Sequence, residues 1–187
     1  MSTKNILSIP NESECFKIMG KYEMLPNIIE HSIQVKNVSI AIANNLISKN
    51  SVNMELICAG ALLHDIAKTI TLQTGERFHD KMGANLIMEL GYPQVAEICA
   101  SHVFLDSFNP HGDIEEREIV HYSDKRVKHD KIVSLEERFE DLLIRYGTTE
   151  KSRASILENQ KFLYLLDEKI NRHSIKNIDE ILLNNAK

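Results

Sequence analysis

Apolar residues recur every three or four positions along almost the whole of this chain, which is the spacing of one face of an α-helix. No segment alternates apolar and polar residues for long enough to indicate a strand, and Gly (7) and Pro (4) are few. The predicted helices cover residues 11–20, 27–49, 53–65, 80–90, 93–105, 115–129, 134–146, 149–172 and 177–185, with longer loops at 69–79 and 106–114. This pattern predicts an all-α fold.

Capping residues support several of the helix boundaries. Asn53 can cap the helix that begins with MELI, and Ser134 with Glu137 forms a capping box. Gly91 and Gly147 each follow a predicted helix, at the position where a left-handed C-terminal cap is expected.

The composition is that of a soluble globular protein. The chain has 187 residues, 43% of them apolar and 26% charged, which suits one domain over residues 1–187. The net charge of −5 argues against a nucleic-acid platform, which is normally basic. No apolar run approaches the about 18 residues of a membrane span, and MSTKNILSIPNESE lacks the apolar segment of a signal peptide. We therefore expect a cytoplasmic protein with no membrane partner.

The three cysteines do not predict a disulfide framework or a structural zinc site. Cys15, Cys58 and Cys99 are odd in number and form no CxxC pair. Cys58 and Cys99 lie in apolar helical segments, so they are interpreted as small buried hydrophobic residues.

Six side chains able to bind a metal ion lie on or beside the apolar faces of the predicted helices. They are His31, His64, Asp65, His79, His102 and Asp124. A lone histidine on such a face is more often a core residue bonded to a backbone carbonyl. Polar groups on five separate segments would each need a partner of their own, whereas one shared metal centre satisfies them together. Histidine with aspartate is a common ligand set for Fe, Mn or Zn, so we predict a metal centre.

The stretch AGALLHDIAK, residues 59–68, places His64 and Asp65 side by side at the end of an apolar helix. Neighbouring side chains on a helix point about 100° apart, but at a helix end both can reach one ion. The two oxygens of the Asp65 carboxylate also allow it to bind one ion and reach a second. This geometry suits an ion held inside a helical bundle.

These segments resemble the HD superfamily of metal-dependent phosphohydrolases over roughly residues 27–130. ALLHDIAK resembles the superfamily signature, in the variant where a small residue and Lys follow the His-Asp pair. IIEHSIQV resembles the segment of the first His, and HYSDKRV that of the last Asp. HDKMGA, together with His102, resembles the extra histidines of the dinuclear branches.

The resemblance implies a helical bundle and hydrolysis of a phosphoester or phosphoanhydride in a nucleotide or small phosphorylated metabolite. It implies one or two divalent transition-metal ions, with Fe or Mn favoured and Zn, Co, Ni or Mg as alternatives. One ion would be held by His31, His64, Asp65 and Asp124, and the second by Asp65, His79 and His102. His111, in the following loop, competes for a place in the second set. Residues 131–187 match nothing in this resemblance and are expected to pack on the core or on a second subunit, which allows a homodimer.

Three further side chains are candidates for substrate binding. Lys68, one helical turn after His64, would act with Asp65 in catalysis by contacting a substrate phosphate, the alternative being a surface Lys at a helix end. If Asp124 faces the metal, His121 and Lys128 lie one turn to either side and would line the phosphate pocket. His121 is also an alternative metal ligand.

The remaining charges near Asp124 are interpreted as a solvated face, which we expect to carry Arg117, Arg126 and His129. Two other functions stay open at this point. A mixed-valent di-iron oxygenase would use the same ligands for different chemistry, and a nucleotide-sensing module would bind without turnover.

Overall fold

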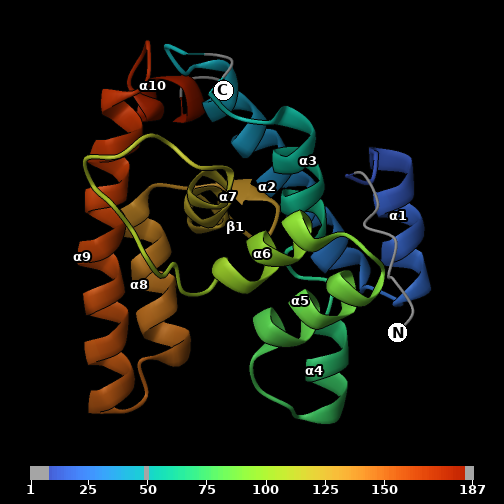
Figure 1. The fold of residues 1–187 in the computed structure, drawn as a ribbon. Coiled ribbons are helices and arrows are strands. Elements are labelled where there is room, and N and C mark those ends of the chain that lie inside the picture. The colour runs from blue at the N-terminus through green and yellow to red at the C-terminus, as the bar shows by residue number, and fades with distance from the viewer. Residues whose placement is uncertain (1–8, 49–50, 184–187) are drawn as a thin grey trace.

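The computed structural model describes residues 9–48 and 51–183, and helices make up most of it (Figure 1). The helices are α1 (Glu12–Lys21), α2 (Pro26–Asn44), α3 (Met54–Leu63), α4 (Lys68–Thr74), α5 (His79–Glu89), α6 (Pro93–Ser101), α7 (Glu116–Lys125), α8 (Leu135–Tyr146), α9 (Glu150–Arg172) and α10 (Ile178–Leu183). Strands β1 (Val127–Lys128) and β2 (Lys131–Ile132) form a short antiparallel hairpin between α7 and α8. The predicted all-α class is confirmed.

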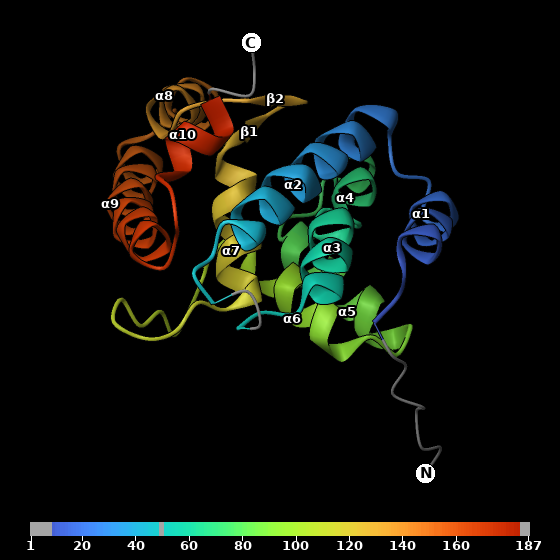
Figure 2. The same ribbon diagram turned by 90° about the horizontal axis from the view of Figure 1, so that it is seen from above.

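Helix α3 lies in the middle of the molecule and packs against α2, α6 and α7 (Figures 1 and 2). Helix α5 pairs with α6, and α1 lies on the outer side of α3. Helices α8 and α9 pair with each other on the opposite side of the molecule from α1, where α9 contacts α7. The C-terminal helices therefore pack on the core of this chain, and a second subunit stays a prediction.

The sequence of α3 explains its central position. Its residues are apolar on every side, and seven of them are buried: Leu56, Ile57, Ala59, Gly60, Ala61, Leu62 and Leu63. A helix that is apolar all round is stable only when it is surrounded by other elements. Gly60 lets α6 approach closely, since a Cβ atom there would lie 2.5 Å from Cδ1 of Ile98.

Most predicted helix boundaries are confirmed within one or two residues. The side chain of Asn53 accepts hydrogen bonds from the first turn of α3, and the Ser134–Glu137 capping box is present. Gly91 has a φ of 91°, as expected for a left-handed cap. The left-handed cap predicted at Gly147 is wrong, because its φ is −77°.

Four predicted elements differ from the structure. Helix α2 ends at Asn44 and not at residue 49, and α6 ends at Ser101 and not at residue 105. The predicted loop 69–79 contains most of α4, which ends at Thr74 and is capped by Gly75 with a φ of 73°. The helix predicted over 115–129 ends at Lys125, and the hairpin replaces its last turn.

Cys99 is buried, as expected, whereas Cys58 is only half-buried. Cys15 is buried as well, and all three cysteines carry free thiols. Over residues 9–48 and 51–183, every helix is too short or too polar to cross a membrane.

Candidate metal centre

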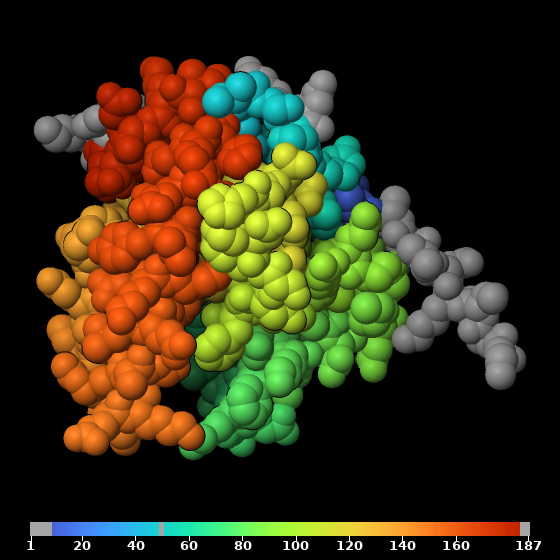
Figure 3. All heavy atoms as spheres, turned by 60° about the vertical axis from the view of Figure 1, so that its left-hand side comes forward, coloured from blue at the N-terminus to red at the C-terminus, as the bar shows by residue number. Residues whose placement is uncertain are grey.

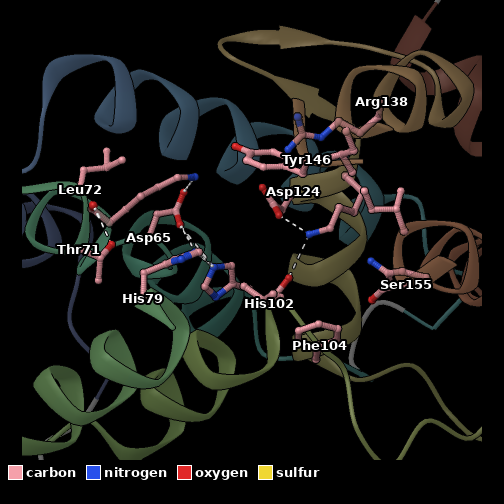
Figure 4. Close-up of a pocket in the computed structure, with 16 residues that line it drawn as sticks. Asp65, Thr71, Leu72, His79, His102, Phe104, Asp124, Arg138, Tyr146 and Ser155 are labelled. Carbon is pink, nitrogen blue, oxygen red and sulfur yellow. Dashed lines mark hydrogen bonds and ion pairs between the residues drawn. The ribbon is translucent and has the colours of Figure 1, made fainter. Parts of the chain in front are cut away.

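The six predicted metal-binding side chains come together from five elements and the turn after α3. His31 lies on α2 and Asp124 on α7, His79 is the first residue of α5, and His64 and His102 directly follow α3 and α6. Asp65 lies in the tight turn between α3 and α4. Figure 4 shows Asp65, His79, His102 and Asp124 facing one another across one end of a pocket. Except for His79, the six residues are buried.

One group of ligand atoms surrounds Asp124. Nε2 of His31 lies 3.0 Å from Oδ1 of Asp124, and Nε2 of His64 lies 3.8 Å from the same oxygen. Nε2 of His64 is also 3.4 Å from Oδ2 of Asp65. Four side chains from three separate parts of the sequence thus direct nitrogen and oxygen atoms toward one point.

A second group surrounds the other oxygen of Asp65. Oδ1 of Asp65 lies 3.2 Å from Nε2 of His79 and 3.4 Å from Nε2 of His102. Ligand atoms of His31, His64 and Asp65, and likewise those of Asp65, His79 and His102, lie within 4.8 Å of one another, close enough to surround an ion. Asp65 is the residue common to both groups.

Backbone carbonyls orient three of the histidines. Nδ1 of His64 lies 2.7 Å from the carbonyl of Ala61, and Nδ1 of His102 lies 2.6 Å from that of Cys99. Nδ1 of His31 lies 2.7 Å from the carbonyl of His129. A ring that donates its Nδ1 proton to a carbonyl presents an unprotonated Nε2, which is the form that binds a metal.

Two of the inward-facing atoms have no hydrogen-bond partner among the described residues. They are Nε2 of His64 and Oδ1 of Asp65, and both are buried. A buried polar atom without a partner is destabilising unless something else satisfies it. A cation between these atoms would satisfy both, so the residues present fit a metal ion.

Nearby positive charges keep the two carboxylates ionised. Burial alone would raise the pKa of Asp65, but the ammonium of Lys68 and the ring of His64 hold it well below its usual value. Burial likewise opposes ionisation of Asp124, and Lys125 and His31 hold its pKa well below the usual value. Burial lowers the pKa of His102, which favours the neutral ring. Ionised carboxylates and a neutral His102 ring are the states that metal ligands need. Burial opposes protonation of His64, but Asp65 and Asp124 raise the pKa of its ring, so a metal ion would have to displace that proton.

The lysines beside the centre were only partly expected from the sequence. Nζ of Lys68 lies 2.6 Å from Oδ2 of Asp65 and the residue lines the pocket, while its contact with a phosphate stays a prediction. Lys125 also lines the pocket, where Nζ bonds Oδ2 of Asp124 and lies 3.1 Å from the carbonyl of His102. Lys125 was not among the site residues predicted from the sequence, although its position directly after Asp124 indicated that it could lie at the site.

The pocket next to these residues has a volume of about 400 Å³. Figure 3 shows the hollow between the C-terminal helices, in orange, and the green segment that contains α4. Helices α8 and α9 supply the wall facing the ligands: Arg138, Leu142, Tyr146, Ser155, Ile156 and Asn159. None of these six residues was predicted from the sequence to belong to the site.

The predicted position of Lys128, one helical turn after Asp124, is wrong. Because α7 ends at Lys125, Lys128 lies in β1, and the helical turn proposed between it and Asp124 does not exist. Its Nζ lies 3.2 Å from Oδ1 of Asp141, and Lys128 is not among the residues that line the described pocket.

His121 is buried, and it is not among the residues that line the pocket. Its Nδ1 lies 3.0 Å from the carbonyl of Ser101, and its ring packs edge-on against Phe162. Burial and the charge of Lys125 lower its pKa to about 3, so the ring is neutral. The competing ligand His111 is exposed in the 106–114 loop.

The prediction that Arg117, Arg126 and His129 lie on a solvated face is also partly wrong. Arg126 is 1% exposed, and its guanidinium bonds the hydroxyl of Tyr122 and the carboxylate of Asp179. Arg117 is half-buried and pairs with Glu115 and Asp106. His129 is exposed, as expected, but its carbonyl accepts the hydrogen bond that orients His31.

Comparison with known proteins identifies two relatives of this chain and the family to which it belongs. A tRNA (cytidine(56)-2'-O)-methyltransferase of Thermoplasma volcanium is 33% identical over 101 residues, which cover 54% of this chain and 28% of the relative. Ribonuclease Y of Finegoldia magna is 34% identical over 107 residues, which cover 54% of this chain and 18% of the relative. The chain thus spans less than a third of the length of either relative, and no solved structure gave a significant match. The sequence model of the HD domain matches residues 28–176, which include all six ligand candidates, and the chain therefore belongs to the HD domain family.

Proposed function

We propose that this protein is a metal-dependent phosphohydrolase that cleaves a phosphoester or phosphoanhydride in a nucleotide or another small phosphorylated metabolite. One observation carries the proposal: two groups of metal-competent atoms share Asp65 at one end of a pocket that also contains Lys68, Lys125 and Arg138. Cations and metal ligands together suit a substrate that is itself a phosphate.

The ligand assignment is part of the proposal. His31, His64, Asp65 and Asp124 would hold one divalent ion, and Asp65, His79 and His102 the second. The mixture of imidazole and carboxylate donors favours Fe or Mn and accepts Zn or Co. Bound ions would lower the pKa of a water molecule and neutralise charge on the phosphoryl oxygens.

The protein's own residues would position the substrate. The ammonium groups of Lys68 and Lys125 reach the pocket from either side of the ligands and would donate hydrogen bonds to phosphate oxygens. Asp65 and Asp124 stay ionised because these lysines adjoin them, so the ligands keep their charge while substrate is bound. The wall from α8 and α9 limits the access of bulk water to the phosphate.

The relatives support a nucleotide as the substrate class. The names of both relatives refer to enzymes of RNA, whose monomer is a nucleotide. The net charge of −5 and a pocket of about 400 Å³ favour a small molecule over a nucleic acid chain.

Phosphate release tests the proposal. Protein loaded with Mn²⁺ or Fe²⁺ is expected to release inorganic phosphate from nucleotides, and Asp65→Asn is expected to abolish that release. An oxygenase would instead consume O₂ with an organic substrate, and a sensing module would bind nucleotide without turnover. Either result, with no phosphate released, would overturn the proposal.

A further inference from the structure

A second, smaller cavity adjoins the metal pocket along α9. It has a volume of about 200 Å³ and is lined by Phe104, Leu105, Ser155, Glu158, Asn159 and Phe162. We call it the second compartment. Three of its residues, Phe104, Ser155 and Asn159, also line the metal pocket, so the two cavities are neighbours. Figure 4 places Phe104 and Ser155 at the far side of the metal pocket from Asp65 and His79.

The two compartments have opposite electrostatic character. The metal pocket contains Lys68, Lys125 and Arg138 as well as the ligands. The second compartment is lined by one ionisable side chain, the carboxylate of Glu158, and by neither Lys nor Arg. A second phosphate group would be repelled there, whereas an uncharged group with hydrogen-bond donors would be attracted.

Aromatic and amide side chains complete the second compartment. The ring of Phe104 is 64% exposed, and Phe162 is half-buried with its ring against Phe108 and His121. Exposed aromatic faces of this kind stack well on flat heteroaromatic rings. The Asn159 amide offers both a donor and an acceptor, and within the described part of the chain Ser155, Glu158 and Asn159 make no side-chain hydrogen bond.

We propose that the second compartment binds the non-phosphate end of the substrate, a flat, uncharged heteroaromatic ring that carries an amino group, such as an amino-bearing nucleobase. The ring stacks on Phe104 and Phe162, its amino group donates to Glu158, and its phosphate lies at the metal centre. This rests on the proposed function, because it takes the metal pocket to be the phosphate site.

Three substrates separate the contributions of the ring and of its amino group. AMP carries both, purine riboside 5'-monophosphate carries the ring without the amino group, and ribose 5-phosphate carries neither. We expect kcat/KM to fall in that order, with AMP at least about tenfold above the compound without the amino group, since a hydrogen bond to a charged acceptor is lost. The difference is expected mainly in KM, because the ring lies away from the reacting atoms.

Glu158→Leu provides the test in the protein. It removes the acceptor and keeps an apolar side chain on α9, so it should lower kcat/KM for AMP about tenfold and leave that for ribose 5-phosphate unchanged. Glu168→Leu is the matched control, since Glu168 is exposed on the same helix and lines neither compartment. This control should leave the values for all three substrates unchanged.

The two proposals can fail separately. Equal kcat/KM for AMP, purine riboside 5'-monophosphate and ribose 5-phosphate would overturn the assignment of the second compartment while leaving the phosphohydrolase intact. An equal loss on all three substrates in Glu158→Leu would overturn it as well. If no substrate releases phosphate, the proposed function fails, and calorimetry on the metal-loaded protein decides the second compartment. At least about tenfold tighter binding of AMP than of purine riboside 5'-monophosphate, lost in Glu158→Leu, would support it, and equal Kd values would overturn it.

Discussion

Nε2 of His79 and Nε2 of His102 lie 3.1 Å apart, and both point at Oδ1 of Asp65. Nδ1 of His102 already faces the carbonyl of Cys99, so its Nε2 is available as a lone pair rather than a donor. Two imidazoles and a carboxylate oxygen arranged in this way could form one side of a coordination sphere. The second metal position therefore rests on geometry as specific as that of the first.

We predict close to two transition-metal ions per chain in protein purified without chelator. Five of the six ligand candidates form two groups that share Asp65, and Asp124 adjoins the first group. The double variant His79→Ala, His102→Ala should therefore reduce the metal content to about one. Elemental analysis measures both values. A wild-type content of one ion, unchanged in the double variant, would leave only the single-metal site.

Asp65→Asn should abolish phosphatase turnover while the helical bundle stays folded. Asp65 is the residue common to both ligand groups, and the amide has no charge to hold two cations. Circular dichroism checks the fold and phosphate release checks the activity. Asp113→Asn, in the exposed 106–114 loop, is the control. Normal turnover in Asp65→Asn would remove this residue from the mechanism.

Lys125→Met should lower kcat/KM about ten- to a hundredfold, the cost of one charge-assisted hydrogen bond to the substrate. Lys128→Met should lower it less than about threefold, because Lys128 pairs with Asp141 and does not line the described pocket. Steady-state kinetics on the same substrate compares the two variants. A larger loss in Lys128→Met than in Lys125→Met would contradict the placement of the phosphate site.

Removal of metal should lower the melting temperature. An ion that binds the native state stabilises it by mass action, and its loss leaves Nε2 of His64 and Oδ1 of Asp65 buried without hydrogen-bond partners among the described residues. Calorimetric melting with and without EDTA measures the shift, and Mn²⁺ in excess of the chelator should restore it. Identical melting curves in wild-type protein would falsify tight metal binding.

A buried ion pair between α9 and α7 should contribute to the stability of the fold. Nζ of Lys169 lies 2.7 Å from Oε1 of Glu118, and both residues are 1% exposed. Lys169→Met leaves the buried Glu118 carboxylate without a cation, with the backbone N–H of Glu115 still donating to it, and should reduce the free energy of unfolding by about 3–5 kcal/mol. The double variant Lys169→Met, Glu118→Gln should recover most of that loss. Urea unfolding gives both values, and a double variant no more stable than Lys169→Met would argue against a charge effect.

The sequence by itself determined the fold class and the six ligand candidates. Helical periodicity is a local property, and it placed His31 and Asp124 on apolar faces that had to point inward. The adjacent His64 and Asp65 then indicated a shared partner, which predicted a metal centre before any contact was known. Burial and distances in the structure agree with that placement.

Only the tertiary structure decided which lysine and arginine side chains lie at the site and which helices form the wall of its pocket. Helix α7 ends at Lys125, where the hairpin begins and the carbonyl of Arg126 accepts a hydrogen bond from the backbone N–H of Val133. This removes Lys128 from the face of Asp124. Arg126 is buried because Asp179 on α10 meets it, a partner 53 residues away. The second compartment exists because Glu158 and Phe162 on α9 meet Phe104 after α6. An amphipathic sequence shows which face of a helix is apolar, but not which distant surface it packs against, since that depends on the shapes of all the other helices.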